Sequence, residues 1–288
     1  MTDLFSEPSG QRLLVDLRAL FEKSPVFQRK DKHIIFVCGG PTKTRAKTMR
    51  RRFLEWSKKN FPEIISILAE DAFRPTEYYK SPSDIDLAAF ETIIGEIADC
   101  VVLFPESVGS YAEIGYFANK NIISKKILVA NCIGYQTEDS FLNLGPIRML
   151  DQLSFLKPTV QLPCPCTNFS PLKKRMKRLL SSSKRRRFNF RPYWKMNYRE
   201  KFLATLQLIS LLQPVDLDGL NTCVKAVFDS TKPEEIGHLV AILDAAGYLQ
   251  SKDDCFSLAG GMRPLLEFEG ANLEKFRTQV VYHYRKLA

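Results

Sequence analysis

Long hydrophobic runs are missing from this 288-residue sequence. A membrane-spanning helix needs about 20 consecutive apolar residues, and no stretch of the chain approaches that length. The first ten residues also lack the basic and apolar regions of a signal peptide. We therefore expect a cytoplasmic protein with no membrane segment. A hydrophobic content of 45% favours an ordered chain that is long enough for two domains.

Histidine is scarce, with only three residues, and the seven cysteines do not form a metal-binding pattern. The Cys164-Pro-Cys166 pair lacks the spacing of zinc ligands, so we expect no metal and no bound cofactor. Cys38, Cys100 and Cys132 each stand alone within an apolar run. This placement is typical of reduced core thiols rather than of disulfides.

Acidic residues are absent from the segment 164–199, which contains twelve Lys or Arg residues. The whole chain has a formal net charge of +10, so the rest of it carries −2. Four aromatic residues are interleaved with these cations: Phe188, Phe190, Tyr193 and Trp194. Cations that bind phosphates, beside rings on which bases stack, predict contact with a nucleic acid, although a charge run can also be a solvated linker. The candidate nucleic-acid-binding residues are Lys173, Lys174, Arg175, Lys184, Arg185, Arg186, Arg187 and Arg191.

Strand-like and helix-like segments alternate in the first half of the chain. Short apolar runs predict four buried strands, at 32–38, 64–68, 100–104 and 126–131. Helical patterns lie before and between them, at 11–23, 44–60 and 83–98. The alternation indicates an α/β fold with a parallel sheet flanked by helices. Clustered prolines then mark a boundary near Leu162, which predicts a domain over 1–162 and a linker over 163–199.

The last part of the chain, 200–288, has a different pattern. It predicts three helices, a hairpin and a final helix, at 200–212, 217–228, 233–246, 248–258 and 272–287. Three helices followed by a hairpin are typical of a winged-helix domain. The third helix contains Glu234, Glu235 and Asp244 and no Lys or Arg, so it would repel phosphates. We expect this domain to serve assembly rather than to read DNA.

The segment Val101–Ala118 places two carboxylates beside one expected crevice. Glu106 follows an apolar strand, and Gly109 with Ser110 supplies a turn and a helix N-cap, so Glu113 falls in the first helical turn. Ligands of open α/β sheets bind outside the carboxyl ends of the strands. A carboxylate there can act as a nucleophile or stabilise an oxocarbenium-like sugar carbon, and Glu113 is the candidate.

Both acids also have a purely structural interpretation. Ser110 and Glu113 match the S-x-x-E capping box, in which Glu113 only caps the helix. As an active residue, Glu113 would be kept ionised by the nearby helix N-terminus. Glu106 could bind a ribose hydroxyl or orient the nucleophile, or it could be an exposed loop acid.

Three further positions near the expected crevice have weaker patterns. Gly39 and Gly40, after the first strand, would let a ligand approach the backbone, but such pairs also occur in ordinary loops. Glu91 is either a site acid or a solvated helix acid. Asp84 and Asp86, at the start of the same helix, are most simply capping residues.

The run LFPESVGSYAEIGYFANK, followed by SFLNLGPIRMLDQL, resembles the effector proteins of type II retrons, which join a nucleoside deoxyribosyltransferase-like domain to a C-terminal winged-helix domain. The resemblance extends over nearly the whole chain. It implies that Glu113 is the nucleophile, that Glu106 holds the substrate and that Glu91 is an acid on the preceding helix. Asn143 corresponds to an asparagine that the family borrows from a neighbouring subunit, which implies a homo-oligomer. The candidate substrate-binding residues are then Gly39, Gly40, Glu91, Gly109, Ser110 and Asn143.

The resemblance also implies a biological role. It implies a toxin that is held inactive by a retron reverse transcriptase and its multicopy single-stranded DNA. The expected reaction is cleavage or transfer at the N-glycosidic bond of a nucleotide without a metal, and NAD is an alternative substrate. Two other functions stay open, namely a non-catalytic module that senses a nucleotide by its phosphate and a DNA-binding regulator.

Overall fold

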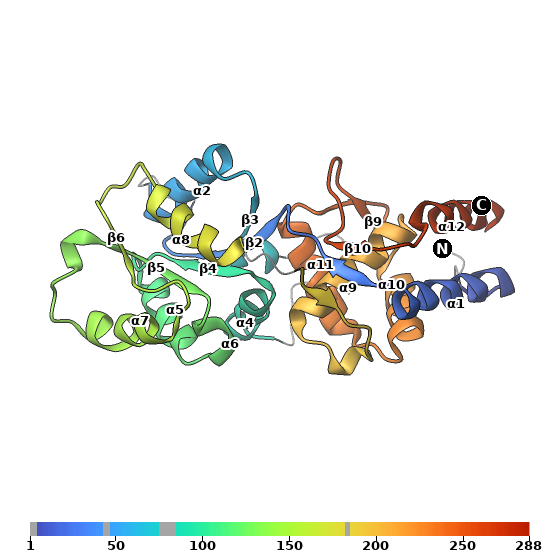
Figure 1. Cartoon of the computed structure of the whole chain (residues 1–288), viewed down its shortest axis with the longest axis horizontal. Helices are drawn as coiled ribbons and strands as arrows, with labels where there is room; N and C mark the ends of the chain where they lie inside the picture. The colour runs from blue at the N-terminus through green and yellow to red at the C-terminus, as the bar shows by residue number, and fades with distance from the viewer. Residues whose placement is uncertain (1–4, 43–46, 75–84, 182–184, 288) are drawn as a thin grey trace. The chain divides into compact units, whose positions relative to one another are not determined.

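A computed structural model describes residues 5–42, 47–74, 85–181 and 185–287 (Figure 1). The chain folds into two compact units. The sheet unit comprises Asp31–Asp71 and the described part of Ile85–Ser183. The helical unit combines the described parts of Met1–Lys30 and Lys184–Ala288 with residues 72–74.

Five parallel strands form the sheet unit, in the order β3-β2-β4-β5-β6. They are β2 (His33–Cys38), β3 (Ile64–Ile67), β4 (Cys100–Leu103), β5 (Ile127–Cys132) and β6 (Val160–Leu162). The central strands are buried on both faces, which explains their nearly continuous apolar runs. The predicted α/β fold with a parallel, helix-flanked sheet is confirmed, and β6 is an additional strand too short to stand out in the sequence.

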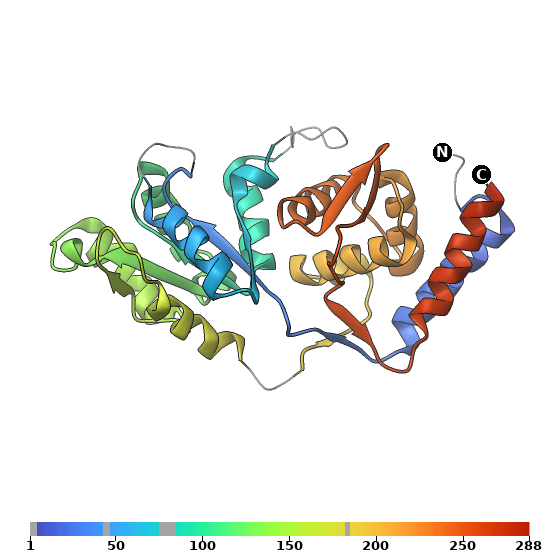
Figure 2. The same ribbon diagram turned by 90° about the horizontal axis from the view of Figure 1, so that it is seen from above.

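Helices cover both faces of this sheet (Figures 1 and 2). Because side chains alternate along a strand, Ile35 and Val37 of β2 face a core shared with α2 (Met49–Asn60) and α8 (Ser170–Leu180). Phe36 faces the other way and contacts the ring of Phe117 with centroids 6.1 Å apart. The other helices of this unit are α3 (Ala69–Ala72), α4 (Leu87–Ile97), α5 (Val108–Ala118), α6 (Asn121–Ser124) and α7 (Arg148–Leu153).

The segment predicted as a linker, 163–199, is divided between the two units. Its first half forms α8, whose Leu172 and Met176 are buried in the core of the sheet unit together with Phe169. The cations of α8 lie on the opposite side of an amphipathic helix, so a basic composition conceals a packed apolar face. The boundaries therefore differ from the predicted 1–162, 163–199 and 200–288.

Cys132 and Cys164 form a disulfide, so the expectation of a reduced Cys132 is wrong. The parallel register places Cys132 opposite Leu162, which brings the Cα atoms of the two cysteines to 5.7 Å. Spacing along the sequence could not show this pairing, because it depends on β5 and β6 being neighbours. Cys38 and Cys100 are buried free thiols, as predicted.

The helical unit contains three central helices and a hairpin. They are α9 (Tyr198–Leu212), α10 (Leu217–Phe228), α11 (Pro233–Ala245), β8 (Leu249–Lys252) and β9 (Cys255–Leu258), and α12 (Leu273–Leu287) follows. α9 is buried from residue 201 to its end. This order is the expected one, and the winged-helix assignment stays a prediction. No helix in the described ranges has both the length and the apolarity needed to cross a membrane.

The N-terminal segment belongs to the helical unit, whereas the sequence analysis placed it in a domain over 1–162 with the sheet. It forms α1 (Pro8–Lys23) and β1 (Val26–Gln28). β1 is the middle strand of a small antiparallel sheet, between β7 (Arg187–Phe188) and β10 (Leu266–Phe268). These partners are distant in the sequence, so no local pattern could identify them.

Candidate active site

Ser107, and not Ser110, caps the helix that carries Glu113. The Ser107 Oγ accepts a hydrogen bond from the backbone N–H of Ser110 at 3.2 Å, and the Ser110 Oγ accepts one from the backbone N–H of Ser107 at 2.9 Å. This reciprocal pair is a capping box. α5 therefore begins at Val108, and Glu113 lies in its second turn. The capping interpretation of Glu113 is wrong because the chain enters the helix earlier than expected.

Glu113 is largely buried, and its Oε2 has no hydrogen-bond partner among the described residues. Burial raises the pKa of Glu113 to about 7, against the opposing effect of the Arg50 guanidinium. The expectation that the helix N-terminus keeps Glu113 ionised is wrong, because desolvation outweighs a dipole effect that fades beyond the first turn. The side chain is therefore poised between its two protonation states at neutral pH.

Glu91 of α4 shares this environment. Only 8% of its surface is exposed, so it is not a solvated helix acid. Burial, followed by the charge of Glu113, raises the pKa of Glu91 to about 8. The two carboxylates also help to raise the pKa of Cys38, the last residue of β2, whose main cause is burial. Glu91 and Glu113 therefore converge at the carboxyl end of β2, the edge at which a ligand was expected.

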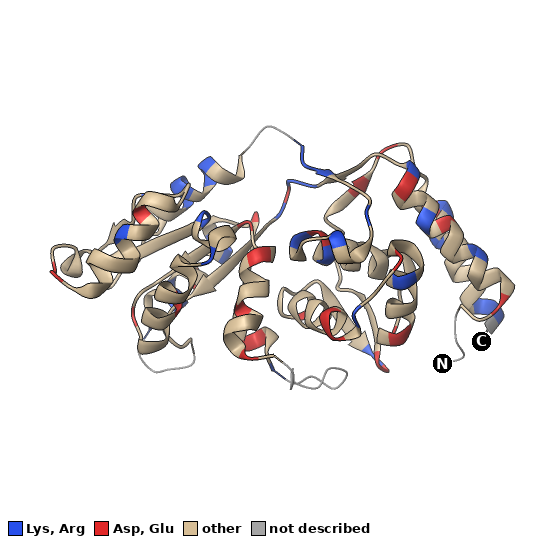
Figure 3. Cartoon of the chain, turned by 90° about the horizontal axis from the view of Figure 1, so that it is seen from below, with Lys and Arg blue, Asp and Glu red and all other residues tan. Residues whose placement is uncertain are grey.

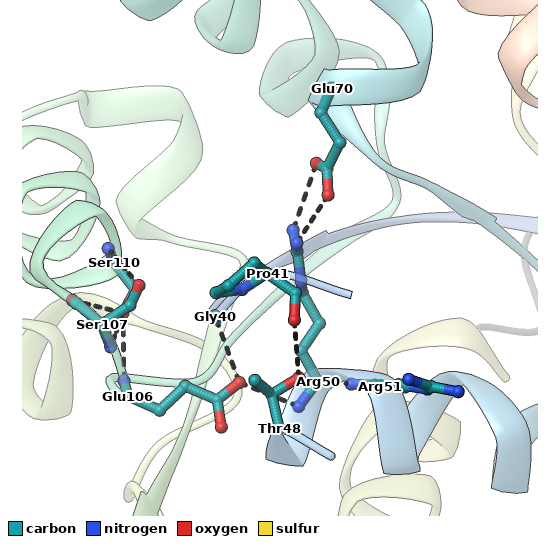
Figure 4. Close-up of polar contacts among 9 residues, drawn as sticks. All are labelled: Gly40, Pro41, Thr48, Arg50, Arg51, Glu70, Glu106, Ser107 and Ser110. Carbon is teal, nitrogen blue, oxygen red and sulfur yellow. Dashed lines mark hydrogen bonds and ion pairs between the residues drawn. The ribbon is translucent and has the colours of Figure 1, made fainter. Parts of the chain in front are cut away.

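Arg50 and Glu70 complete the group, and the sequence reasoning missed both. Arg50 is 5% exposed, and its guanidinium makes a two-point ion pair with the Glu70 carboxylate at 2.5 and 3.2 Å (Figure 4). Its Nε is buried without a hydrogen-bond partner among the described residues. Arg50 stands within a run of three arginines, so only its position at the start of α2 could have distinguished it.

The Glu106 carboxylate holds the backbone at the entrance to α2 (Figure 4). Its Oε1 accepts hydrogen bonds from the N–H groups of Gly40 and Arg50, each at 3.0 Å. Its Oε2 accepts one from Met49 at 2.6 Å. Carboxylates at a helix N-terminus satisfy otherwise unpaired N–H groups there. Glu106 is therefore not an exposed loop acid, and it positions the helix that carries Arg50. It also lines a cavity of about 210 Å³ with Met49 and Tyr111, so its role in holding a substrate stays a prediction.

The two glycines after β2 are required by this close packing. A Cβ at Gly40 would lie 2.9 Å from the Thr48 Cγ2 and 3.2 Å from the Glu106 Cγ. A Cβ at Gly39 would lie 3.0 Å from the Arg50 Cβ. The pair therefore lets the loop approach the protein's own side chains, and the approach of a ligand stays a prediction.

Gly109 and Ser110 differ in what surrounds them. A Cβ at Gly109 would meet nothing within 4 Å, so packing does not demand a glycine there. Ser110 is fully buried, and its hydroxyl accepts hydrogen bonds from the backbone N–H groups of Glu106 and Ser107. Ser110 thus supports the turn beneath Glu113 rather than facing a ligand directly.

Asn143 lies at a different place from Glu113. It begins a π-helical turn, Asn143–Ile147, and its side-chain amide donates to the carbonyl oxygens of Tyr135 at 2.7 Å and Glu138 at 2.9 Å. It also lines a cavity of about 470 Å³ with Tyr111 and exposed Phe141. The lining of this cavity does not include Glu113. Within one chain, the structure therefore does not bring Asn143 to the Glu113 group.

The cations predicted to bind nucleic acid divide between the two units. Lys173, Lys174 and Arg175 belong to α8 of the sheet unit, whereas Arg185, Arg186, Arg187 and Arg191 belong to the helical unit. Lys184 lies outside the described residues. Arg185 makes ion pairs with both Glu267 and Glu269, and Arg191 pairs with Glu200 at 3.0 Å. Acids outside the segment 164–199 thus compensate charges that looked unpaired within it.

The aromatic residues of the same segment mostly serve the core. Phe188 and Tyr193 are 3% and 2% exposed, and the ring of Phe190 packs against Phe228. Trp194 is 66% exposed. The predicted stacking of bases on these rings is therefore wrong for the two buried residues, because Phe188 packs edge-on against Phe21 and the Lys201 ammonium lies over the ring of Tyr193.

Comparison with known proteins identifies relatives in bacterial retrons. A family model described as "STM3845 retron effector protein" matches residues 46–251. Two Escherichia coli proteins match shorter regions. "Retron Ec86 putative ribosyltransferase/DNA-binding protein" is 30% identical over 116 residues, which cover 40% of this chain and 36% of that protein. "Retron Ec73 putative ribosyltransferase/DNA-binding protein" is 27% identical over 124 residues, which cover 43% and 39%. The matched region is thus less than two fifths of each of these relatives.

Proposed function

Since the chain belongs to the STM3845 retron effector family, we propose that it is an enzyme that cleaves or transfers at the N-glycosidic bond of a nucleotide. The observation that carries this proposal is the buried carboxylate of Glu113, whose Oε2 is unpartnered among the described residues. Two residues from other helices interact with this carboxylate through their charges. Glu113 raises the pKa of Glu91 on α4, and Arg50 on α2 lowers the pKa of Glu113. The names of the two relatives both include the words "putative ribosyltransferase", which supports the same reaction class.

Glu113 acts as the nucleophile in this scheme. Its carboxylate oxygen attacks the anomeric carbon of the sugar, the bond from that carbon to the base nitrogen breaks, and the electron pair leaves with the base. A water molecule or a second acceptor then attacks the same carbon and releases Glu113. Because the two displacements each invert the carbon, the net reaction retains its configuration.

Glu91 supplies the proton that the departing base requires. Its raised pKa, about 8, exceeds the value of about 7 for Glu113. At neutral pH, Glu91 is therefore the carboxyl that keeps its proton, while Glu113 more readily ionises. Two nearby acids whose environments separate their pKa values are suited to opposite roles.

Arg50 favours the reactive form of Glu113. Its guanidinium lowers the pKa of Glu113 and opposes the effect of burial. The ion pair with Glu70 fixes the guanidinium, and Glu106 fixes the first turn of α2 from which it projects. These two acids are positioning residues, since they act through Arg50.

Membership of a retron effector family supports a proposal about regulation. The protein would be a toxin restrained by a retron reverse transcriptase and its multicopy single-stranded DNA, with a nucleotide or NAD as the substrate. Self-association is part of the proposal, because Asn143 lines a separate cavity beside Phe141, which is 89% exposed, and Leu144, which is 56% exposed. Sedimentation of a single monomeric species that retains activity would contradict it.

A pair of isosteric substitutions tests the reaction. Glu113→Gln removes the nucleophile, and the matched control Glu7→Gln changes an exposed acid of the helical unit. We expect wild type and Glu7→Gln to arrest cells and deplete a nucleotide pool measured by mass spectrometry, whereas Glu113→Gln does neither. Equal arrest and equal pools for all three proteins would refute the enzyme, and nucleotide binding without turnover would favour the sensing module.

A further inference from the structure

The outer faces of α2 and α8 form one cationic surface of the sheet unit. Phe53 of α2 and Met176 of α8 point into the core, so the polar sides of both helices face outward. We name this surface the α2–α8 face and define it by the exposed cations Lys58, Lys59, Lys174 and Arg178. Figure 3 shows the Lys and Arg positions along α8.

Direct contacts join the two helices into a continuous surface. The Lys173 Nζ donates a hydrogen bond to the backbone oxygen of Asn60, the last residue of α2. The ammonium groups of Lys173 and Lys177 lie 5.1 and 6.0 Å from the ring centroid of Phe61. Phe169, just before α8, packs its ring edge-on against Trp56 of α2. The last turn of α2 therefore lies against α8.

The charge of this face is not compensated by neighbouring acids. Glu55 pairs with Lys47 and Arg51, both at 3.1 Å, and Glu63 approaches Lys177 at 3.9 Å. Among the described residues, no ion pair or hydrogen bond engages the side chains of the four cations that define the face. By contrast, Arg185 and Arg191 in the helical unit are both ion-paired.

We propose that the α2–α8 face binds the phosphate backbone of a nucleic acid. Uncompensated Lys and Arg side chains attract a polyanion and release its condensed counterions on binding. A membrane surface fits less well, because the described parts of α2 and α8 contribute no exposed large apolar side chain that could enter a bilayer. The contact is therefore electrostatic and independent of base sequence. It goes beyond the proposed reaction and does not depend on it.

The test removes the four charges from the full-length protein. The variant Lys58→Ala/Lys59→Ala/Lys174→Ala/Arg178→Ala is compared with a control that loses four exposed cations of the helical unit, Lys252→Ala/Lys275→Ala/Arg277→Ala/Arg285→Ala. Both lose the same formal charge. Thermal unfolding checks that each is folded, and fluorescence anisotropy over a salt series measures binding to labelled single-stranded DNA, single-stranded RNA and duplex DNA.

We expect the α2–α8 variant to bind single-stranded DNA roughly a hundredfold more weakly at physiological salt, with a log–log salt slope smaller by about 3, while the control binds nearly as wild type. The three probes distinguish the kind of nucleic acid. Equal losses for both variants, or wild-type binding by the α2–α8 variant, would overturn the proposal. So would a loss of binding to anionic vesicles with oligonucleotide binding unchanged. Glu113→Gln should bind the probes normally, which separates this result from the fate of the proposed reaction.

Discussion

Glu113 and Glu91 have raised pKa values chiefly because burial disfavours a charged carboxylate. The charge of Arg50 lowers the pKa of Glu113 and so partly offsets the effect of burial. The result is a pair of acids that titrate near neutral pH, whereas isolated glutamates ionise at about 4.3. We therefore expect pH to act on the proposed reaction through both groups.

The pH dependence of kcat/KM should therefore be bell-shaped. The rate should fall below a pH of about 7, as Glu113 gains a proton, and above a pH of about 8, as Glu91 loses its proton. Glu91→Gln should lower the rate roughly 10²–10⁴-fold, the usual contribution of general acid catalysis, and abolish the alkaline fall. Steady-state kinetics across this range provides the measurement. An alkaline limb that persists in Glu91→Gln would exclude Glu91 as the acid.

Arg50→Gln should shift the acidic limb of this profile to higher pH. Arg50 lowers the pKa of Glu113, so its removal leaves the effect of burial less opposed. The adjacent Arg51 pairs with Glu55 at 3.1 Å, and Arg51→Gln provides the matched control, which should leave the limb in place. The same kinetic titration measures both variants. An unshifted limb in Arg50→Gln would show that the guanidinium does not stabilise the ionised nucleophile.

At this scale, the sequence could identify candidates but not their environments. Glu113 and Glu91 were found from a motif and a resemblance, yet both acquire their raised pKa only when α4, α5 and β2 meet. Glu70 was missed because it occupies a helix of four residues with no pattern of its own. Burial and pairing are properties of the folded chain, so residue type and spacing could not supply them.

The start of α2 is the element on which the site depends. Three backbone N–H groups converge on Glu106, and the helix is also capped by Thr48, whose side chain accepts a hydrogen bond from Arg51 at 3.2 Å. Charge-assisted hydrogen bonds are stronger than neutral ones. Glu106 should therefore contribute more than the cap to the stability of this element.

Glu106→Ala should lower the free energy of unfolding by roughly 3 kcal/mol, because hydrogen bonds to a charged group are lost and their donors are left unpaired. Thr48→Ala is the control for a lost cap and should cost about 1 kcal/mol. Urea denaturation of the full-length variants measures both. A cost for Glu106→Ala no larger than for Thr48→Ala would contradict the assignment of Glu106 as the residue that holds this helix.

The parallel strands were predictable because burial on both faces leaves an unbroken apolar run. β2 and β5 each match their predicted range within one residue at either end. The capping box was misplaced by three residues, since Ser107 and Ser110 both fit the N-cap pattern. The hydrogen bonds formed in the folded chain select Ser107 as the N-cap, and the sequence pattern alone could not distinguish it from Ser110.

The arrangement of the whole molecule was the least predictable. α1 has an apolar stripe that could pack on either unit, and its partners are set by rings from distant segments. Phe21 contacts Phe188, Phe228 and Phe268 edge-on, with centroids 6.1, 5.1 and 5.1 Å away. Contacts of such high sequence separation have no local signature.

Phe21→Ala should destabilise the helical unit by about 3–5 kcal/mol, the usual cost of removing a buried phenylalanine. Hydrogen exchange of the full-length protein locates the effect. Protection should fall in β1, β7 and β10 and remain unchanged in β2, β4 and β5, because Phe21 lies in the helical unit. Equal loss of protection in both sets of strands would show that the two units do not unfold separately.

The central position of β1 also determines when the protein can be completed during its synthesis. Gln28 pairs with Leu266, about 240 residues later, and a ribosome adding roughly 5–20 residues per second needs about 12–50 s to cover that span. The sheet unit, Asp31–Asp71 with Ile85–Ser183, leaves the ribosome within this interval. Glu91 and Glu113 can therefore come together in the nascent chain before β10, the partner strand of β1, has been synthesised.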